Sequence, residues 1–214
     1  MDNNIKFTPP QFSNIKYLVL DYIQSSGTQY IDTGVKADTS YYRIDFNMSA
    51  VSFNNTSVYG HYGSDSPRRS IGFGAFSSSG LTCGFGLNNE SAYPLGITDY
   101  NFHDISVEYS NGVGKYKSDS SDYSSVSVSG IDGSVSDYIF AYHDYSLGAK
   151  LNCSIKLSYF KIYSGSSTTL VRDYIPVIRW SDLAIGMYDK ANDKFYANAG
   201  SGTFGKGNVI GIIK

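Results

Sequence analysis

The 214-residue chain is short of several residue types, and each shortage argues against a class of protein. It holds two cysteines, Cys83 and Cys153, which are too few for a disulfide framework. They either form one bridge across the fold or remain as two buried thiols. Lys and Arg number 17 against 19 Asp and Glu, a formal net charge of -2. Binding of nucleic acid through its phosphates needs a clustered basic excess, so no nucleic-acid partner is expected.

Long apolar runs are also missing. In the N-terminal region the longest is "YLVL", residues 17–20, which is too short for the apolar core of a secretory signal. A membrane-spanning helix needs about 20 apolar residues, so no membrane span is expected. Glutamate is scarce, because Glu90 and Glu108 are the only two among the 19 acidic residues and the other 17 are aspartates. Glutamate favours helix interiors whereas aspartate favours turns and caps, so this ratio points away from helices.

What the chain has in abundance is aromatic residues and glycine, with 20 Tyr, 12 Phe and 22 Gly. Such a composition suits pleated strands that are joined by tight turns. In "YYRIDFNMSAV", the residues Tyr42, Ile44, Phe46 and Met48 alternate with Arg43, Asp45 and Asn47, which predicts one core face and one solvent face. In "KLNCSIKLSYFKIYSG", the residues Ile155, Leu157 and Tyr159 are expected to share one face, with Phe160 and Ile162 after them.

About a dozen such runs recur with turn signals between them, as in a sandwich or barrel. The dipeptide Asn111-Gly112 favours a hairpin. The serine-rich segment 118–136 is interpreted as a strand with turns. The sequence therefore predicts an all-β, antiparallel two-sheet β-sandwich of the jelly-roll type, with residues 17–214 as a single domain.

Residues 1–16 form an N-terminal arm in this interpretation, because "FTPPQF" carries two adjacent prolines that disfavour helix and interrupt strand pairing. The arm is either a frayed terminus or a segment that docks on a partner. The candidate attachment residues are Ile5, Phe7, Pro9, Pro10 and Phe12.

Motifs for catalysis and cofactor binding are weak. Gly200, Gly202 and Gly205 match G-x-G-x-x-G, but "NVIGIIK" follows where a phosphate-binding helix should begin, so a glycine-rich turn is predicted. The three histidines lack helical metal-ligand spacing, and no nucleophile elbow is present. No catalytic residue and no cofactor are assigned, and the metal-binding residues are unknown. A glycoside hydrolase built on a pair of aspartates is retained as the less favoured alternative.

Sugar binding is the chemistry that suits a surface rich in tyrosine and aspartate, because aromatic rings stack on apolar sugar faces while polar groups bond hydroxyls. Two predicted loops carry this mixture. The candidate ligand-binding residues are His61, Tyr62, Asp65, Arg68 and Arg69 in "HYGSDSPRR", and Tyr142, His143, Asp144 and Tyr145 in "YHDYS". Trp180, the sole tryptophan, is expected to be a core or interface anchor.

Two terminal motifs, "YIQSSGTQYIDTG" at residues 22–34 and "LVRDYIPVIRWSDLAIGMYDKANDKFYANAGSGTFGKG" at residues 170–207, carry a family resemblance. Together with "FHDISVEYSNGVGKY" and "KLSYFKIYSG" they resemble a concanavalin-A-like, laminin-G-type jelly-roll domain. That domain is associated with structural proteins of gut-bacterial phages and prophages, and with surface proteins of those bacteria. The E-x-D-x-x-E string of laminarinase-type relatives does not occur here, and calcium is implied by fold analogy only.

The resemblance implies a non-catalytic virion structural protein, as a capsid decoration, head fibre or tail-associated protein. Its partners would be other virion proteins and cell-surface polysaccharide, with a homo-oligomer as one arrangement. Without a signal peptide, the expected location is the virion surface after assembly in the host cytoplasm. A bacterial adhesin or carbohydrate-binding module is the alternative. The stretch "YIQSSGTQYIDTG" is expected to be an opening strand and turn that pairs near the closing "KFYANAGSGTFGKG".

Overall fold

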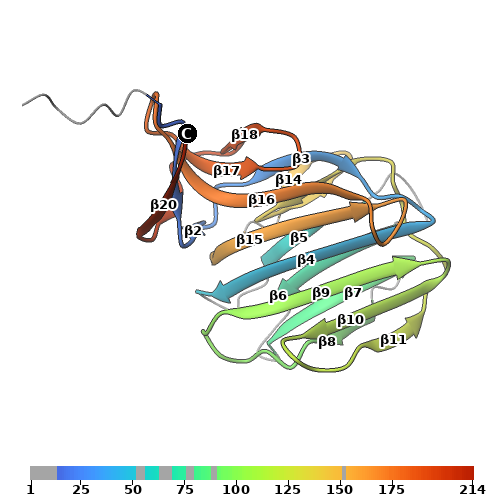
Figure 1. The fold of residues 1–214 in the computed structure, drawn as a ribbon. Coiled ribbons are helices and arrows are strands. Elements are labelled where there is room, and N and C mark those ends of the chain that lie inside the picture. The colour runs from blue at the N-terminus through green and yellow to red at the C-terminus, as the bar shows by residue number, and fades with distance from the viewer. Residues whose placement is uncertain (1–13, 52–55, 63–68, 76–79, 88–90, 151–152) are drawn as a thin grey trace, which may run out of the picture.

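Two β-sheets lie face to face and enclose the core (Figure 1). The computed structural model describes residues 14–51, 56–62, 69–75, 80–87, 91–150 and 153–214, and at residues 56, 69–75, 86–87 and 91–92 it describes the backbone alone. These residues form twenty strands and no helix, so they hold no helical candidate for a membrane span. The predicted all-β sandwich is confirmed.

The front sheet has twelve strands and faces the viewer in Figure 1. Its main path, in spatial order, is β11 (Ser124–Ser127), β10 (Val113–Ser118), β9 (His103–Ser110), β4 (Tyr41–Ala50), β15 (Ile155–Ser164), β16 (Leu170–Arg179), β1 (Tyr17–Leu20) and β20 (Val209–Ile213). Four shorter strands attach to this path: β17 (Ile185–Asp189) and β18 (Lys194–Ala197) beside β16, and β2 (Ile23–Gln24) and β19 (Gly205–Lys206) beside β15.

The back sheet has eight strands. Its main path is β14 (Gly148–Lys150), β13 (Tyr142–Asp144), β5 (Thr56–Tyr62), β6 (Arg69–Ala75), β7 (Leu81–Leu87) and β8 (Ser91–Pro94), while β12 (Ser136–Ile139) pairs with both β5 and β3 (Ile31–Lys36). Among the described strand pairs, β13 with β5 is the single parallel one. The strand count exceeds the predicted dozen partly because "DYIFAYHDY" divides into β12 and β13, where Phe140 takes a positive φ of 70°.

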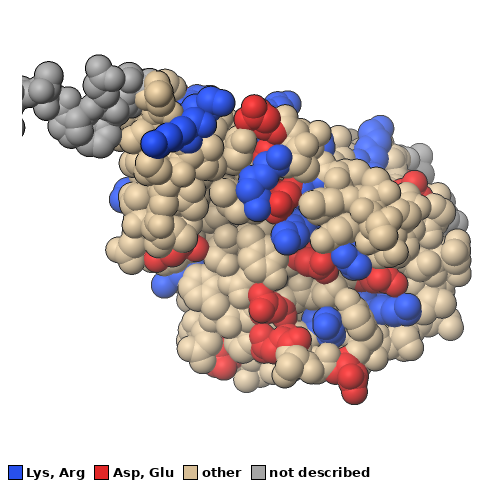
Figure 2. Space-filling view, in the orientation of Figure 1, with Lys and Arg blue, Asp and Glu red and all other residues tan. Residues whose placement is uncertain are grey.

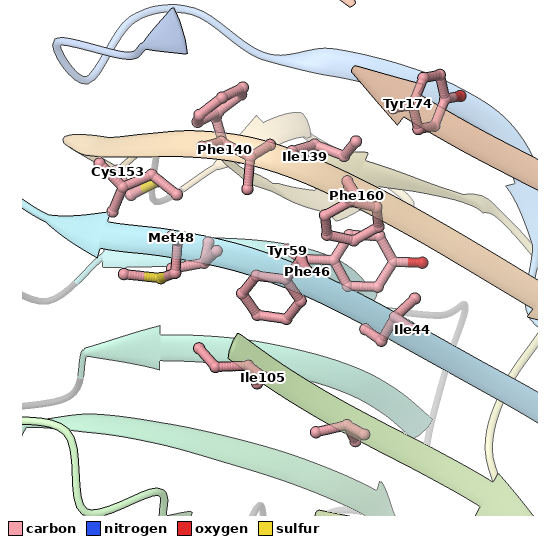
Figure 3. Close-up of a cluster of buried hydrophobic side chains, with 14 of the residues drawn as sticks. Ile44, Phe46, Met48, Tyr59, Ile105, Ile139, Phe140, Cys153, Phe160 and Tyr174 are labelled. Atoms are coloured by element: carbon pink, nitrogen blue, oxygen red, sulfur yellow. The ribbon is translucent and has the colours of Figure 1, made fainter. Parts of the chain in front are cut away.

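The core lies between the sheets and follows the predicted alternation of β4. Ile44, Phe46 and Met48 are buried, and the polar residues between them face outward. The ring of Phe160 from β15 lies 4.9 Å from that of Tyr59 from β5 and 5.3 Å from that of Phe46, so aromatic contacts join the two sheets (Figure 3). Cys83 and Cys153 are buried free thiols, which confirms the second of the two alternatives for the cysteines.

The two ends of the chain meet on the front sheet, as predicted. β19 pairs with β2, and β20 pairs with β1. In the loops beside them the amide of Ser201 donates to Thr28 O at 3.1 Å, and the amide of Ala199 donates to Tyr30 O at 2.9 Å. The glycine-rich segment 200–207 is therefore a turn leading into an edge strand, as its sequence indicates, and β20 rather than a helix follows it.

The remaining turn predictions have the expected geometry. Asn111 and Gly112 have φ values of 47° and 83° and join β9 to β10 in a hairpin. The serine-rich segment holds β11 between turns. The arm was predicted to end at residue 16, yet Lys16 already belongs to the sheet's hydrogen bonding, since its amide donates to Ile213 O at 2.8 Å. Residues 1–13, with the candidate attachment residues, lie outside the described residues.

A charged group lies inside the sandwich. The Oδ2 atom of Asp137, at the end of the fully buried side chain, accepts hydrogen bonds from the hydroxyls of Tyr42 at 2.6 Å and Tyr59 at 2.5 Å. Its Oδ1 atom lies 2.5 Å from Nδ1 of His61, whose Nε2 lies 2.6 Å from the backbone oxygen of Asp132. An ionised carboxylate and a carbonyl only accept, so with Asp137 ionised both ring nitrogens of His61 donate and the imidazole is protonated.

The pKa of His61 agrees with this geometry. Burial by itself lowers the pKa, but the charge of Asp137 and the hydrogen bonds to Asp137 and Asp132 outweigh burial and raise it above 6.5. Because Tyr42 comes from the front sheet and Tyr59 and His61 come from the back sheet, the Asp137 carboxylate links the two layers.

We predict that Asp137→Asn destabilises the fold by about 3–5 kcal/mol, because it leaves a buried imidazolium without its counter-charge. The amide nitrogen also cannot accept the hydroxyl hydrogen bonds that Oδ2 holds. Urea unfolding at pH 6 measures the effect, with the exposed Asp122→Asn as the matched control. Equal stability of the two variants would contradict a structural role for the carboxylate.

Candidate functional site

The two predicted ligand loops do come together, but as strands. β5 and β13 run side by side in parallel, with His61 opposite His143 and Tyr62 opposite Asp144. The rings of Tyr62 and Tyr142 lie 4.6 Å apart. This juxtaposition of "HYG" and "YHDY" was not predicted, since a parallel contact between distant segments leaves no local signal.

Two of these residues need correction. His61 is fully buried in the Asp137 cluster, and Tyr142 is 1% exposed. Neighbouring residues cover both side chains, including the ring of Tyr62 that packs on Tyr142, so neither side chain is available to a ligand in this structure. In this structure both side chains pack in the interior of the protein.

The other residues of this region have separate positions. Tyr62, His143 and Asp144 are half-buried and Tyr145 is 40% exposed. The His143 ring stacks on Tyr138 at 4.1 Å, and Asp144 Oδ1 accepts hydrogen bonds from the amides of Ser146 and Leu147, which closes a turn. Asp65 and Arg68 lie outside the described residues, and Arg69 begins β6 with its backbone alone described. Ligand binding on this surface stays a prediction.

A hollow lies elsewhere, on the outer face of the front sheet. It has a volume of about 380 Å³ and extends over β15, β4, β9 and β10. Charged side chains of both signs gather over the face of the molecule that these strands form (Figure 2). We call this hollow the front groove.

Strand register arranges the front groove as transverse rows. In one row, which we call the middle row, Lys161, Asp45, Ser106 and Lys117 lie directly opposite one another on β15, β4, β9 and β10. The next row holds Tyr159, Asn47 and Asp104, with Asp119 beyond them in the turn after β10. Directly opposed residues on neighbouring strands point to the same face, so each row presents its side chains together.

A β-bulge in β15 places Tyr159 in the groove. Leu157 pairs with Met48 and Tyr159 pairs with Asn47, so Ser158 is an extra residue in the ladder. An extra residue reverses the alternation after it. Tyr159 therefore faces outward and Phe160 inward, whereas the sequence predicted that Ile155, Leu157 and Tyr159 share one face. That prediction was wrong because a bulge shifts the period without changing the residue pattern.

The acidic side chains of the groove already hold partners. Asp104 Oδ1 accepts hydrogen bonds from the Tyr159 hydroxyl and the Asn47 amide, both at 2.9 Å. Asp45 accepts one from the Ser106 hydroxyl at 2.6 Å, and its Oδ2 lies 3.3 Å from Arg43 Nε. These bonds hold the ring of Tyr159 and fix the polar floor of the groove.

His103 contacts Asp119, one of the residues that line the groove. Its Nδ1 lies 2.8 Å from Asp119 Oδ2 and its Nε2 lies 2.9 Å from Asp99 Oδ1. Partial burial by itself lowers the pKa of His103, but the hydrogen bonds to Asp119 and Asp99 and their negative charges raise it above 6.5. Below this raised pKa, the protonated ring ties the loop before β9 to the turn after β10.

We predict that the NMR titration of the His103 ring has a midpoint above pH 6.5 and that Asp119→Asn lowers this midpoint. The imidazolium contributes its stabilisation fully below pH 6.5, and that contribution is lost as the pH rises through the raised pKa. Loss of one resonance in His103→Gln assigns the signal. A midpoint at or below pH 6.5 in the wild type would contradict the pairing of the His103 ring with the carboxylates of Asp119 and Asp99.

None of the residues that line the front groove was predicted from the sequence to bind a ligand. The predicted solvent face of "YYRIDFNMSAV" includes Arg43, Asp45 and Asn47, which was a correct signal for one strand. The sequence pattern does not show that β15 and β9 lie on either side of β4, so it could not predict which side chains share the groove. Trp180, predicted as a core or interface anchor, is 40% exposed and lines a second hollow of about 300 Å³ beside Tyr17 and Arg179.

Known structures share this fold. The native heptameric SAP-like pentraxin from Limulus polyphemus superposes with a TM-score of 0.51 at 12% identity, over 92% of this chain and 97% of the pentraxin chain. Domains LG4-5 of the mouse laminin α1 chain give a TM-score of 0.51 at 12% identity, over 82% of this chain and 48% of that chain. The chain has the concanavalin-A-like, laminin-G-type sandwich fold. No protein family matches the sequence, and no curated protein does.

Described residues offer no group of three or more His, Cys, Asp and Glu side chains arranged to hold a metal ion. Calcium therefore stays a prediction from fold analogy. The front groove is the candidate site that we take further, because in-register polar and aromatic side chains line a hollow there.

Proposed function

We propose that the protein binds polysaccharide in the front groove without cleaving it. The observation that carries the proposal is the groove itself, an open trough of about 380 Å³ in which a tyrosine ring borders in-register rows of polar side chains. A sugar ring offers an apolar face for stacking and hydroxyls for hydrogen bonds, and the groove supplies both kinds of partner. An open trough suits a chain that extends beyond the contact, whereas a small molecule needs more enclosure.

Tyrosines stand on both sides of the polar floor. Tyr159 borders it on β15, and Tyr123, which is 43% exposed, borders it near β10. The Tyr123 hydroxyl lies 2.7 Å from the Ser106 hydroxyl, which ties this ring to the middle row. A saccharide chain lying across the strands would meet the two rings one after the other.

Binding without hydrolysis is supported by the state of the carboxylates. Asp45 and Asp104 each accept hydrogen bonds from neighbouring side chains, and these bonds position Ser106 and Tyr159. Incubating the protein with a bound polysaccharide should release no reducing ends. Release that disappears in Asp104→Asn would favour the hydrolase alternative.

We predict that Tyr159→Ala weakens polysaccharide binding at least about tenfold, since aromatic anchors of this kind carry much of an interface's energy. Affinity electrophoresis against a panel of neutral and acidic polysaccharides, run with and without a calcium chelator, measures the change. Tyr159→Phe keeps the ring and should retain most of the affinity.

Tyr145→Ala is the matched control, because Tyr145 belongs to the rival back-sheet surface and is 40% exposed. It should leave the affinity unchanged. The reverse result, with loss in Tyr145→Ala and none in Tyr159→Ala, would move the site to the back sheet.

We further propose, on the family resemblance, that the domain is carried by a phage virion as a decoration, head fibre or tail-associated protein. The N-terminal segment with the candidate attachment residues Ile5 to Phe12 would attach it to other virion proteins, and the groove would face outward. An antibody raised against the domain should label phage particles in electron micrographs. Labelling confined to the bacterial envelope would favour the alternative of a bacterial adhesin or carbohydrate-binding module.

A further inference from the structure

The middle row of the front groove has a lysine at each end. Lys161 on β15 and Lys117 on β10 enclose Asp45 and Ser106, and all four residues are in register. Neighbouring strands are about 4.8 Å apart, so the backbones of the two lysines are separated by roughly 14 Å. Both lysine side chains line the hollow and are half-buried.

Asp45 has the Arg43 guanidinium beside it, whereas these two ammonium groups have no ion-pair partner in the part of the chain that the structure describes. Among the described residues, neither Lys117 nor Lys161 has a carboxylate oxygen within 4.0 Å. Each lies instead over a tyrosine ring, Lys117 at 4.9 Å from the Tyr123 centroid and Lys161 at 5.7 Å from that of Tyr159. The rings are therefore positioned to hold the cations beside the place where a sugar would stack.

The acid between them does not cancel their charge. Asp45, directly opposite Lys161 in the ladder, has its Oδ2 3.3 Å from Arg43 Nε and accepts the Ser106 hydroxyl through Oδ1. The row itself carries two positive charges and one negative charge, and Arg43, which lines the groove from the adjacent row, adds a third positive charge. The neighbouring row is acidic, with Asp104 and Asp119. The groove thus has one basic side and one acidic side.

We propose that the front groove selects polysaccharides whose sugars carry carboxylates, that is uronic-acid polymers, and that Lys117 and Lys161 are the selecting residues. Ligand carboxylates lie over the lysine row, while ligand hydroxyls donate to the acidic row. A neutral chain in the same position would cover two ammonium groups without a partner, which carries a desolvation cost. Charge-assisted hydrogen bonds to a carboxylate remove that cost. This inference rests on the proposed polysaccharide binding and adds the class of sugar.

The test compares polygalacturonate with its methyl ester, which has the same backbone without the charge. Alginate and hyaluronate, each with its ester, extend the comparison to other uronic acids. Isothermal titration at two salt concentrations gives the affinities. The wild type should bind the acids about ten- to a hundredfold more tightly than the esters at low salt, and this margin should shrink as salt rises.

Lys117→Met with Lys161→Met keeps the side-chain stems and removes the charges. This double variant should lose the preference for the acids and keep its affinity for the esters. Lys115→Met is the matched control, because Lys115 lies on the same strand but pairs with Glu108 at 3.3 Å, and it should behave as the wild type. Thermal melting confirms that each variant is folded.

Three outcomes separate the ideas. Equal binding of acid and ester by the wild type overturns the selection of uronic acids and leaves polysaccharide binding intact. An equal loss on acid and ester in the double variant does the same, because it shows that the lysines serve general contact. Absence of binding to every polymer, neutral or acidic, overturns the proposed function and this inference together.

Discussion

The pairing of β4 with β15 on one side and β9 on the other is the constraint on which both the core and the groove depend. Antiparallel hydrogen bonding fixes which residues stand opposite one another, and the period of two then assigns each of them to a face. Ile44, Phe46 and Met48 enter the core because Arg43, Asp45 and Asn47 face solvent. The same register builds the rows of the groove. A slip of one residue would exchange the two faces and destroy both.

The Asp137 cluster adds specificity to this packing. Hydrophobic contact between two sheets is non-directional and tolerates many relative placements. A buried carboxylate that needs the hydroxyls of Tyr42 and Tyr59 and the ring of His61 is satisfied in only one of them. Fully satisfied polar networks in a low-dielectric interior act in this way, since a misplacement leaves a charge unpaired. In the sequence His61 resembled a ligand residue, and the structure gives it this interior role.

The outer faces of the two sheets differ in the side chains that they offer to a ligand. Where β5 and β13 meet, two of the six candidate ligand residues with described side chains are buried, and Asp144 closes a local turn. On the front sheet, three long neighbouring strands present polar and aromatic side chains over a hollow. Asp104 holds Tyr159 and Asp45 holds Ser106, so these parts of the groove are organised before any ligand arrives. Such preorganisation lowers the ordering cost of binding.

Local patterns were sufficient for much of this protein. Alternation identified the core face of β4, Asn111-Gly112 located a hairpin, and scarce glutamate with abundant aromatics indicated an all-β chain. The stretch at residues 22–34 was correctly expected to meet the chain's closing segment. These features depend on neighbouring residues or on a motif shared with a known domain, and either can be recognised from the sequence alone.

The sites depend on contacts between distant segments. Neither the parallel contact of β5 with β13 nor the order β15-β4-β9-β10 leaves a local trace. The bulge at Ser158, which turns Tyr159 outward, follows from how β15 must fit both β4 and the core. By itself the sequence determined the period, the turns and the fold class, because these arise from each residue's own conformational and hydrophobic preferences. Only the tertiary structure decided which side chains share a surface, because strand order and register are set by the packing of the whole sandwich.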